Sequence, residues 1–162
     1  MAVGSRDNSK NVTTETGHSK TEIYDYSTST WTSKNDYPFH EEIFVFEVVP
    51  LLTNFLIFGG LHPDEKSSGF DATSVIALFN PDLDKWTKMG SLQYSRHAFG
   101  VIAIQNKYLI MGGSRDKRTE TCEVTGEAIE CESREPIVNN FWYFPAMMVV
   151  SEESINQCKK PT

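Results

Sequence analysis

The chain has 162 residues and a formal net charge of −7. Its Lys and Arg residues are scattered along the sequence, which argues against nucleic acid or an anionic membrane as the main partner. The longest apolar stretch, 43–60, is interrupted by Glu47, Pro50, Thr53 and Asn54, so it predicts two buried strands and a turn and no membrane span.

The first part of the chain predicts a polar lead-in followed by a β-hairpin. Residues 4–20 are dominated by Ser, Thr, Lys and Asn and are expected to form a loop or a disordered segment. They include a possible glycosylation sequon at Asn11. Residues 24–31 place turn formers between aromatic positions and end in Trp31, a pattern typical of a hairpin.

A pair of glycines ends the next predicted strand and returns later in the chain. Gly59-Gly60 follows an apolar run, and Gly112-Gly113 follows a similar run 53 residues further on. Adjacent glycines at the end of a strand predict positive φ angles or a close approach of two backbones. A period near 50 residues is the spacing of one four-stranded blade in a β-propeller.

Between the two glycine pairs, the sequence predicts a loop, a second hairpin and another strand. Residues 61–71 read as a long loop inside the second blade. Residues 78–86 again carry turn formers at their centre and end in Trp86. Arg96-His97 then precedes the apolar strand that leads to Gly112.

A third copy of the hairpin predicts a disulfide from its register. Gly126-Glu127 has the Gly-first order of a type II′ turn, and this turn places Cys122 opposite Cys131. The pair falls at a non-hydrogen-bonded position, with about 4.5 Å between Cα atoms, within reach of a disulfide. Two reduced cysteines packed as small apolar side chains are the alternative. Cys158 is left over in the polar tail, and the lack of closely spaced Cys or His pairs makes a zinc site unexpected.

These motifs together resemble the kelch repeat. In that repeat a Gly-Gly pair leads through a hairpin ending in Trp and an Arg-His segment to the next Gly-Gly pair, as the stretch from Gly59 to Gly113 does here. The first copy departs from the pattern at 39–42, where Arg and His are expected, and the third has Cys131 in place of Trp. The resemblance implies an all-β fold: a partial kelch-type β-propeller with four-stranded antiparallel blades. By alignment, a Cys122–Cys131 bridge would replace the contact between Tyr24 and Trp31.

The chain, 1–162, is expected to form a single kelch-repeat region with approximate blade units 1–60, 61–113 and 114–162, the last incomplete. Because blades bury their faces against one another, and kelch rings normally have six or seven, we expect a fragment of a larger propeller, a truncated gene product, or self-association through open blade faces. Residues 141–144 and 147–150 would lie on one such face. The predicted core consists of Phe44, Phe46, Phe55, Ile57, Ile76, Leu78, Val101, Ile102, Leu109 and Ile110.

The resemblance implies a non-catalytic protein-binding module, a scaffold or adaptor whose partner is another protein. In this family Arg96-His97 would be structural, tying blade strands together. The alternative is part of a galactose-oxidase-like or epimerase-type propeller enzyme. No carboxylate pair lies in an apolar context suited to acid–base catalysis, and neither Gly-Gly pair continues into a phosphate loop, so we expect no catalytic residue, cofactor or metal. The predicted disulfide and the sequon at Asn11 favour an extracellular or secreted location over the cytoplasm.

Overall fold

The computed structural model describes residues 2–3, 19–40, 42–64, 69–113 and 118–135. The regular elements of these residues are β-strands, which confirms the all-β prediction. No helix in this part of the chain is long and apolar enough to cross a membrane. The predictions for Asn11, Cys158 and residues 141–150 fall outside the described residues.

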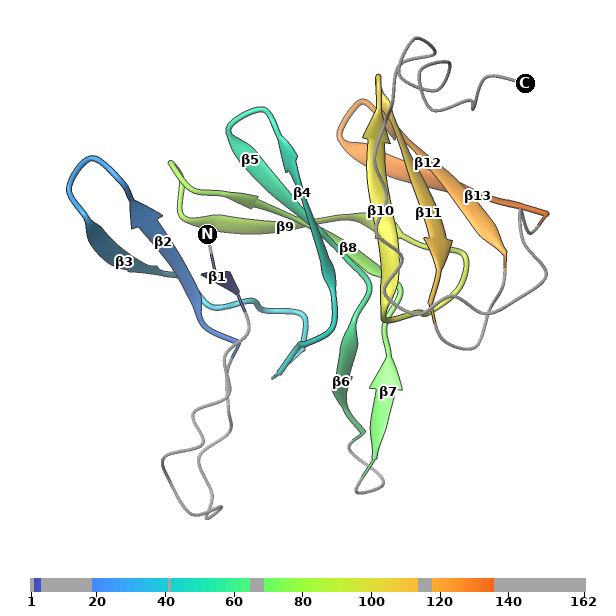
Figure 1. The fold of residues 1–162 in the computed structure, drawn as a ribbon, viewed down its shortest axis with the longest axis horizontal. Helices are drawn as coiled ribbons and strands as arrows, with labels where there is room; N and C mark the ends of the chain where they lie inside the picture. The colour runs from blue at the N-terminus through green and yellow to red at the C-terminus, as the bar shows by residue number, and fades with distance from the viewer. Residues whose placement is uncertain (1, 4–18, 41, 65–68, 114–117, 136–162) are drawn as a thin grey trace, which may run out of the picture.

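The strands form antiparallel meanders in three successive groups (Figure 1). Among the described residues the first group has three strands and each of the others has four, so the second and third groups confirm the four-stranded antiparallel blades. The first comprises β1 (Ala2–Val3), β2 (Thr21–Asp25) and β3 (Thr30–Lys34); the second β4 (Glu47–Leu51), β5 (Asn54–Phe58), β8 (Val75–Asn80) and β9 (Lys85–Ser91); the third β10 (Phe99–Ile104), β11 (Lys107–Gly112), β12 (Thr119–Thr125) and β13 (Ala128–Arg134).

The second and third blades approach most closely at a single parallel bridge. Ile129 of β13 lies opposite Gly90 of β9, and this contact joins the blades into one mixed sheet with the order β10-β11-β12-β13-β9-β8-β5-β4. A Cβ atom on Gly90 would lie 2.2 Å from the carbonyl oxygen of Ile129. The bridge therefore requires glycine at this position.

The tight turns repeat their backbone geometry from one blade to the next. In the β2–β3 and β8–β9 loops, the side chains of Asp25 and Asn80 each accept a hydrogen bond from the backbone N–H two residues later, as in an Asx turn. Both loops end on a left-handed residue, Ser29 with φ 54° and Asp84 with φ 49°. The hairpins predicted from turn formers are confirmed, and so is their recurrence.

The two glycine pairs adopt left-handed conformations at the ends of β5 and β11. Their φ angles are 53° and 115° for Gly59 and Gly60, and 73° and 95° for Gly112 and Gly113. A Cβ on Gly59 would lie 2.7 Å from the carbonyl oxygen of Arg96, and one on Gly113 would lie 2.8 Å from that of His97. Both physical reasons inferred for these glycines, positive φ and close approach, are confirmed.

Two apolar layers fill the spaces between the blades. Because successive side chains of a strand point to opposite faces, β5 sends Leu56 and Phe58 into one layer and Ile57 into the other. The layer between the second and third blades contains the buried residues Val49, Leu56, Phe58, Ile76, Leu92, Phe99, Tyr108, Ile110, Ile129 and the two cysteines of the third blade. The layer facing the first group contains Tyr37, Ile43, Ile57, Ala77, Phe79 and Trp86.

The predicted core is confirmed in part. Ile57, Ile76 and Ile110 are fully buried, whereas the other seven predicted residues are only half-buried: Phe44, Phe46, Phe55, Leu78, Val101, Ile102 and Leu109. Ile102 and Leu109 lie opposite each other across β10 and β11, one position along from the buried Ile110. They therefore point to the face of the third blade that does not pack on the second.

The predicted loop at 61–71 is structured at both ends, so that prediction was wrong there. β6 (Leu61–Pro63) and β7 (Phe70–Ala72) form a two-stranded antiparallel ribbon. Backbone hydrogen bonds from Thr73 N to Gly60 O and from Asp64 N to Gly69 O close its two ends, at 2.9 and 3.0 Å. The ribbon projects from the lower side of the second blade in Figure 1.

Candidate functional site

The two ends of the blades differ in the length of their connections. At one end the β2–β3, β4–β5, β8–β9, β10–β11 and β12–β13 hairpins close with two to four residues. The longer connections, β3–β4, β5–β8, β9–β10 and β11–β12, leave the blades at the other end, which we call the loop face. In Figure 1 the β6–β7 ribbon extends from the loop face, away from the β4–β5 and β10–β11 turns.

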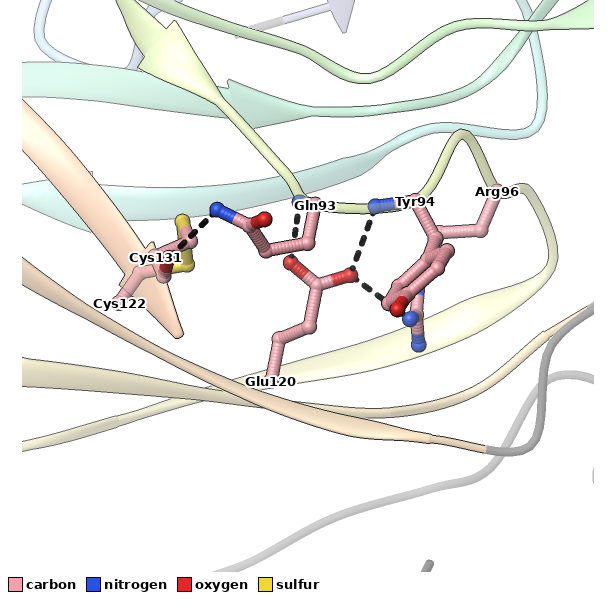
Figure 2. Close-up of a disulfide and its surroundings, with 6 residues drawn as sticks. All are labelled: Gln93, Tyr94, Arg96, Glu120, Cys122 and Cys131. Atoms are coloured by element: carbon pink, nitrogen blue, oxygen red, sulfur yellow. Dashed lines mark hydrogen bonds and ion pairs between the residues drawn. A yellow bond between two sulfur atoms is a disulfide. The ribbon is translucent and has the colours of Figure 1, made fainter. Parts of the chain in front are cut away.

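A buried ion pair lies beneath the loop face and joins two blades (Figure 2). The guanidinium of Arg96, in the β9–β10 connection, donates from Nη2 to Glu120 Oε1 at 2.7 Å. Its Nη1 donates to the carbonyl oxygens of Arg118 and Gly112 at 2.9 and 3.2 Å. Both charged side chains are fully buried. A buried charge is tolerated only when it is paired and hydrogen-bonded, and Arg96 meets that condition by tying its connection to β11 and β12.

The carboxylate of Glu120 completes this network on the other side. Glu120 Oε2 accepts a hydrogen bond from the backbone N–H of Gln93 at 2.7 Å, and Oε1 accepts one from the N–H of Tyr94 at 3.2 Å. Figure 2 shows the carboxylate reaching from β12 to this stretch of backbone. Sequence reasoning singled out Arg96 but missed Glu120.

The third hairpin has the register and the disulfide predicted from its turn. Gly126 has φ 64°, Thr125 lies opposite Ala128, and Cys122 lies opposite Cys131. The two cysteines are joined, with 4.0 Å between their Cα atoms against the predicted 4.5 Å or so. Gln93 Nε2 donates to the carbonyl oxygen of Cys131 at 2.8 Å, which places the disulfide beside the Arg96–Glu120 network (Figure 2).

Glu120 and the two cysteines bring three potential metal-ligand atoms within 4.8 Å of one another. In the oxidised protein the sulfurs are bonded to each other. The carboxylate accepts hydrogen bonds from Arg96 and from the Gln93 and Tyr94 amides. A metal ion would have to displace all of these partners. We therefore interpret Glu120 and the disulfide as structural groups that hold the β9–β10 connection against the third blade.

The two tryptophans of the repeat occupy matching places but have different surroundings. Trp86 packs on Phe79 with ring centroids 4.7 Å apart, and its Nε1 donates to the carbonyl oxygen of Asn35 at 2.9 Å. Trp31 pairs with Tyr24 at 5.2 Å. Trp86 is 8% exposed because Asn35 and Tyr37 of the β3–β4 connection lie against it, whereas Trp31 is 58% exposed. In the third blade the disulfide lies on the face that packs against the second blade. Trp86 has the equivalent position in the second blade, on the face directed toward the first group.

Two histidines stack where the first repeat departs from the Arg-His pattern. The rings of His40 and His62 lie 4.1 Å apart between centroids and are tilted by only 7°. His40 Nε2 lies 2.9 Å from Thr73 Oγ1, and that hydroxyl accepts a hydrogen bond from Val75 N. Burial lowers the pKa of His40, and the charges of His62 and Lys88 lower it further. The neutral imidazole thus links the β3–β4 connection to the base of the β6–β7 ribbon.

Aromatic and basic side chains reach the surface of the loop face. Phe70 is 49% exposed, and its ring packs edge-on against Phe44 at 5.0 Å. The Arg118 guanidinium lies 4.2 Å from the centroid of the Tyr94 ring and donates to the Tyr94 hydroxyl. Aromatic residues and arginine are the types that most often dominate binding energy at protein interfaces. Sequence reasoning did not single out Phe70, Tyr94 or Arg118.

The opposite end also exposes apolar side chains at its short turns. Tyr26 and Trp31 both pack on Tyr24 at the β2–β3 hairpin, and Leu52, Leu83 and Ile104 are exposed at the β4–β5, β8–β9 and β10–β11 turns. The long connections, however, gather at the loop face, where the Arg96–Glu120 network holds one of them in place. We therefore take the loop face as the candidate functional site.

Comparison with known proteins supports the fold. No family model matches the chain, and no curated protein matches it. Among 77 matching chains of solved structures is one titled "Structure of YjhT", with a TM-score of 0.58 and 11% sequence identity over 75% of this chain. The match spans 46% of that chain, less than half of its length. At this identity the similarity shows a shared fold alone.

Proposed function

We propose that the chain is a non-catalytic protein-binding module of the kelch-repeat type, part of a larger propeller, which binds another protein through its loop face. The observation that carries the proposal is the gathering of the long connections at one end of the blades, with Phe70, Tyr94 and Arg118 at the surface there. Loops held by a rigid scaffold are where binding residues concentrate.

The contacts beneath the loop face support this role. Arg96 and Glu120 fix the β9–β10 connection to the third blade, and His40 fixes the β3–β4 connection to the β6–β7 ribbon. A surface held in place before binding loses less conformational entropy when its partner docks. The network therefore favours a preformed binding surface.

A photocrosslinking experiment compares the two ends of the blades. A benzophenone amino acid replaces Phe70 or Tyr94 on the loop face, and Leu52 or Leu83 at the turn end serves as the matched control. We expect the same partner protein to crosslink from both loop-face positions, at least tenfold more strongly than from either turn position. Equal crosslinking from both ends, or different proteins from the two loop-face positions, would contradict the proposal.

A further inference from the structure

We propose that the outer edge of β7 accepts an extended segment of the partner protein as an additional β-strand. This inference rests on the proposed function and names the kind of partner segment that the loop face binds. The segment alternates apolar and basic side chains. Strand addition of this kind obtains affinity from backbone hydrogen bonds and specificity from alternate side chains.

The register of the ribbon determines which backbone groups face its outer edge. Phe44 N donates to Leu61 O at 3.0 Å and Leu61 N donates to Phe44 O at 2.7 Å, so the polar groups of Leu61 point away from β7. Polar groups of successive strand residues point to opposite edges, and antiparallel pairs alternate between bonded and non-bonded. His62 therefore exchanges hydrogen bonds with Asp71, its partner on β7.

The same alternation leaves four polar groups on the far side of β7. Phe70 and Ala72 lie opposite Pro63 and Leu61 at non-hydrogen-bonded positions, so their N–H and C=O groups point outward. β7 has no neighbour beyond β6 in the sheet, and within the described residues no backbone hydrogen bond reaches this edge. Phe70 and Asp71 are exposed and Ala72 is half-buried, so the edge is open to solvent.

The two edges of the ribbon differ in how they are protected. Phe44 covers the edge of β6 through the two hydrogen bonds to Leu61. Proteins protect open edges with charged residues, above all Lys, with Pro, with bulges, or by keeping the edge strand very short. β7 is short and carries Asp71, but it has neither Lys nor Pro, and its pairing with β6 is regular. Its open edge, beside an exposed aromatic ring, is therefore suited to a partner strand that neutralises Asp71.

The side chains of β7 define the chemistry of the added strand. Phe70, resting on Phe44, offers an apolar surface on one face of the ribbon. Asp71 is exposed on the other face, opposite His62. The chain as a whole carries a net charge of −7, which attracts a basic partner. An apolar residue beside Phe70 followed by Lys or Arg beside Asp71 matches both faces.

The test uses a peptide selected from a phage-displayed library of random 12-residue sequences against the full chain. The diagnostic variant is Ala72→Pro, because proline at this position removes the N–H that points to the outer edge and none of the N–H groups that pair with β6. Ala72→Thr, which keeps that N–H, is the matched control. We expect the selected peptide to alternate apolar and basic residues and to lose at least tenfold in affinity for Ala72→Pro. Its affinity for Ala72→Thr should stay within about twofold of wild type.

Amide hydrogen exchange by NMR supplies the second readout. Binding of the peptide should slow exchange at the Phe70 and Ala72 amides. Protection confined to the surroundings of Tyr94 and Arg118, with equal affinity for both variants, would overturn strand addition while the proposed function stands. Selection of no peptide, or protection only at the Leu52 and Leu83 turns, would overturn the inference together with loop-face binding.

Two controls keep the inference falsifiable. Where Ala72→Pro is unfolded by circular dichroism, the wild-type protein is titrated with the peptide N-methylated at alternate residues; a tenfold loss supports strand addition and unchanged affinity overturns it. Light scattering of the peptide-free protein tests whether a second copy of the chain, and not a partner peptide, pairs with the edge of β7. Concentration-dependent dimers that already protect Phe70 and Ala72 would assign the edge to a second copy of the chain.

Discussion

Replacing Arg96 by Met should strongly destabilise the protein, because it leaves a buried carboxylate without its cation. Glu120 is fully buried and loses the guanidinium at 2.7 Å, and the Arg118 and Gly112 carbonyls lose their side-chain donor. Removing one partner of a buried ion pair costs about 3–5 kcal/mol. A domain has a total stability of roughly 5–15 kcal/mol, so Arg96→Met should remove a large part of it.

The chain contains a matched control for this substitution. Arg134 and Glu132 form an ion pair with the same 2.7 Å separation, but their side chains are 60% and 72% exposed. Exposed pairs contribute about 0–1 kcal/mol, so Arg134→Met should have little effect. The assay is urea unfolding followed by tryptophan fluorescence and circular dichroism, with the free energy of unfolding extrapolated to water.

A double substitution distinguishes the effect of the unpaired Glu120 charge from the effect of the packing lost with Arg96. Glu120→Gln keeps an oxygen that can accept from the Gln93 or Tyr94 amide but carries no charge. Added to Arg96→Met, it should recover part of the lost stability, because the uncompensated charge is gone. Equal destabilisation by Arg96→Met and Arg134→Met, or no recovery in the double variant, would refute the reasoning.

Three further predictions concern the disulfide, the glycines and the histidine pair. Reducing the Cys122–Cys131 bond, which closes a loop with a sequence separation of 9, should cost about 2–3 kcal/mol; identical urea midpoints for oxidised and reduced protein would contradict this. Gly90→Ala places a Cβ 2.2 Å from a carbonyl oxygen and should cost more, by the same assay, than Gly126→Ala, where the space is open and the left-handed φ costs about 1–2 kcal/mol; the reverse order would show that the bridge at Gly90 is wrong. Because the folded-state pKa of His40 lies below its ordinary 6.5, the unfolded chain takes up the proton first as the pH falls, so this contribution to stability is present above pH 6.5 and is lost below it. Thermal melts between pH 7.5 and 5 should show a smaller loss for His40→Gln than for wild type, and equal losses would be evidence against the stacked pair.

The sequence was most informative where structure is local. The Cys122–Cys131 register follows from one turn, because a two-residue turn fixes every pair along a hairpin. The Gly59-Gly60 pair likewise predicts its own backbone, since few other residues adopt positive φ without strain. In both cases the residues that determine the geometry are adjacent in the chain.

The sequence was least informative where distant segments meet. Glu120 is buried only because the β9–β10 connection lies over it, and a lone Glu in a strand gives no sign of that partner. Gly90 stands in a strand whose parallel contact with β13 no local pattern specifies. The β6–β7 ribbon was missed because its strands are three residues long, too short for alternation to be recognised. Contacts between blades thus had to come from the structure.

Hydrogen-exchange mass spectrometry of the full chain, with and without the partner recovered by crosslinking, tests the central claim most directly. If the loop face binds the partner, exchange slows in peptides that cover the β5–β8 and β9–β10 connections, and it is unchanged in those that cover the β4–β5 and β8–β9 turns. Protection of the turns with no change in the connections would contradict the account.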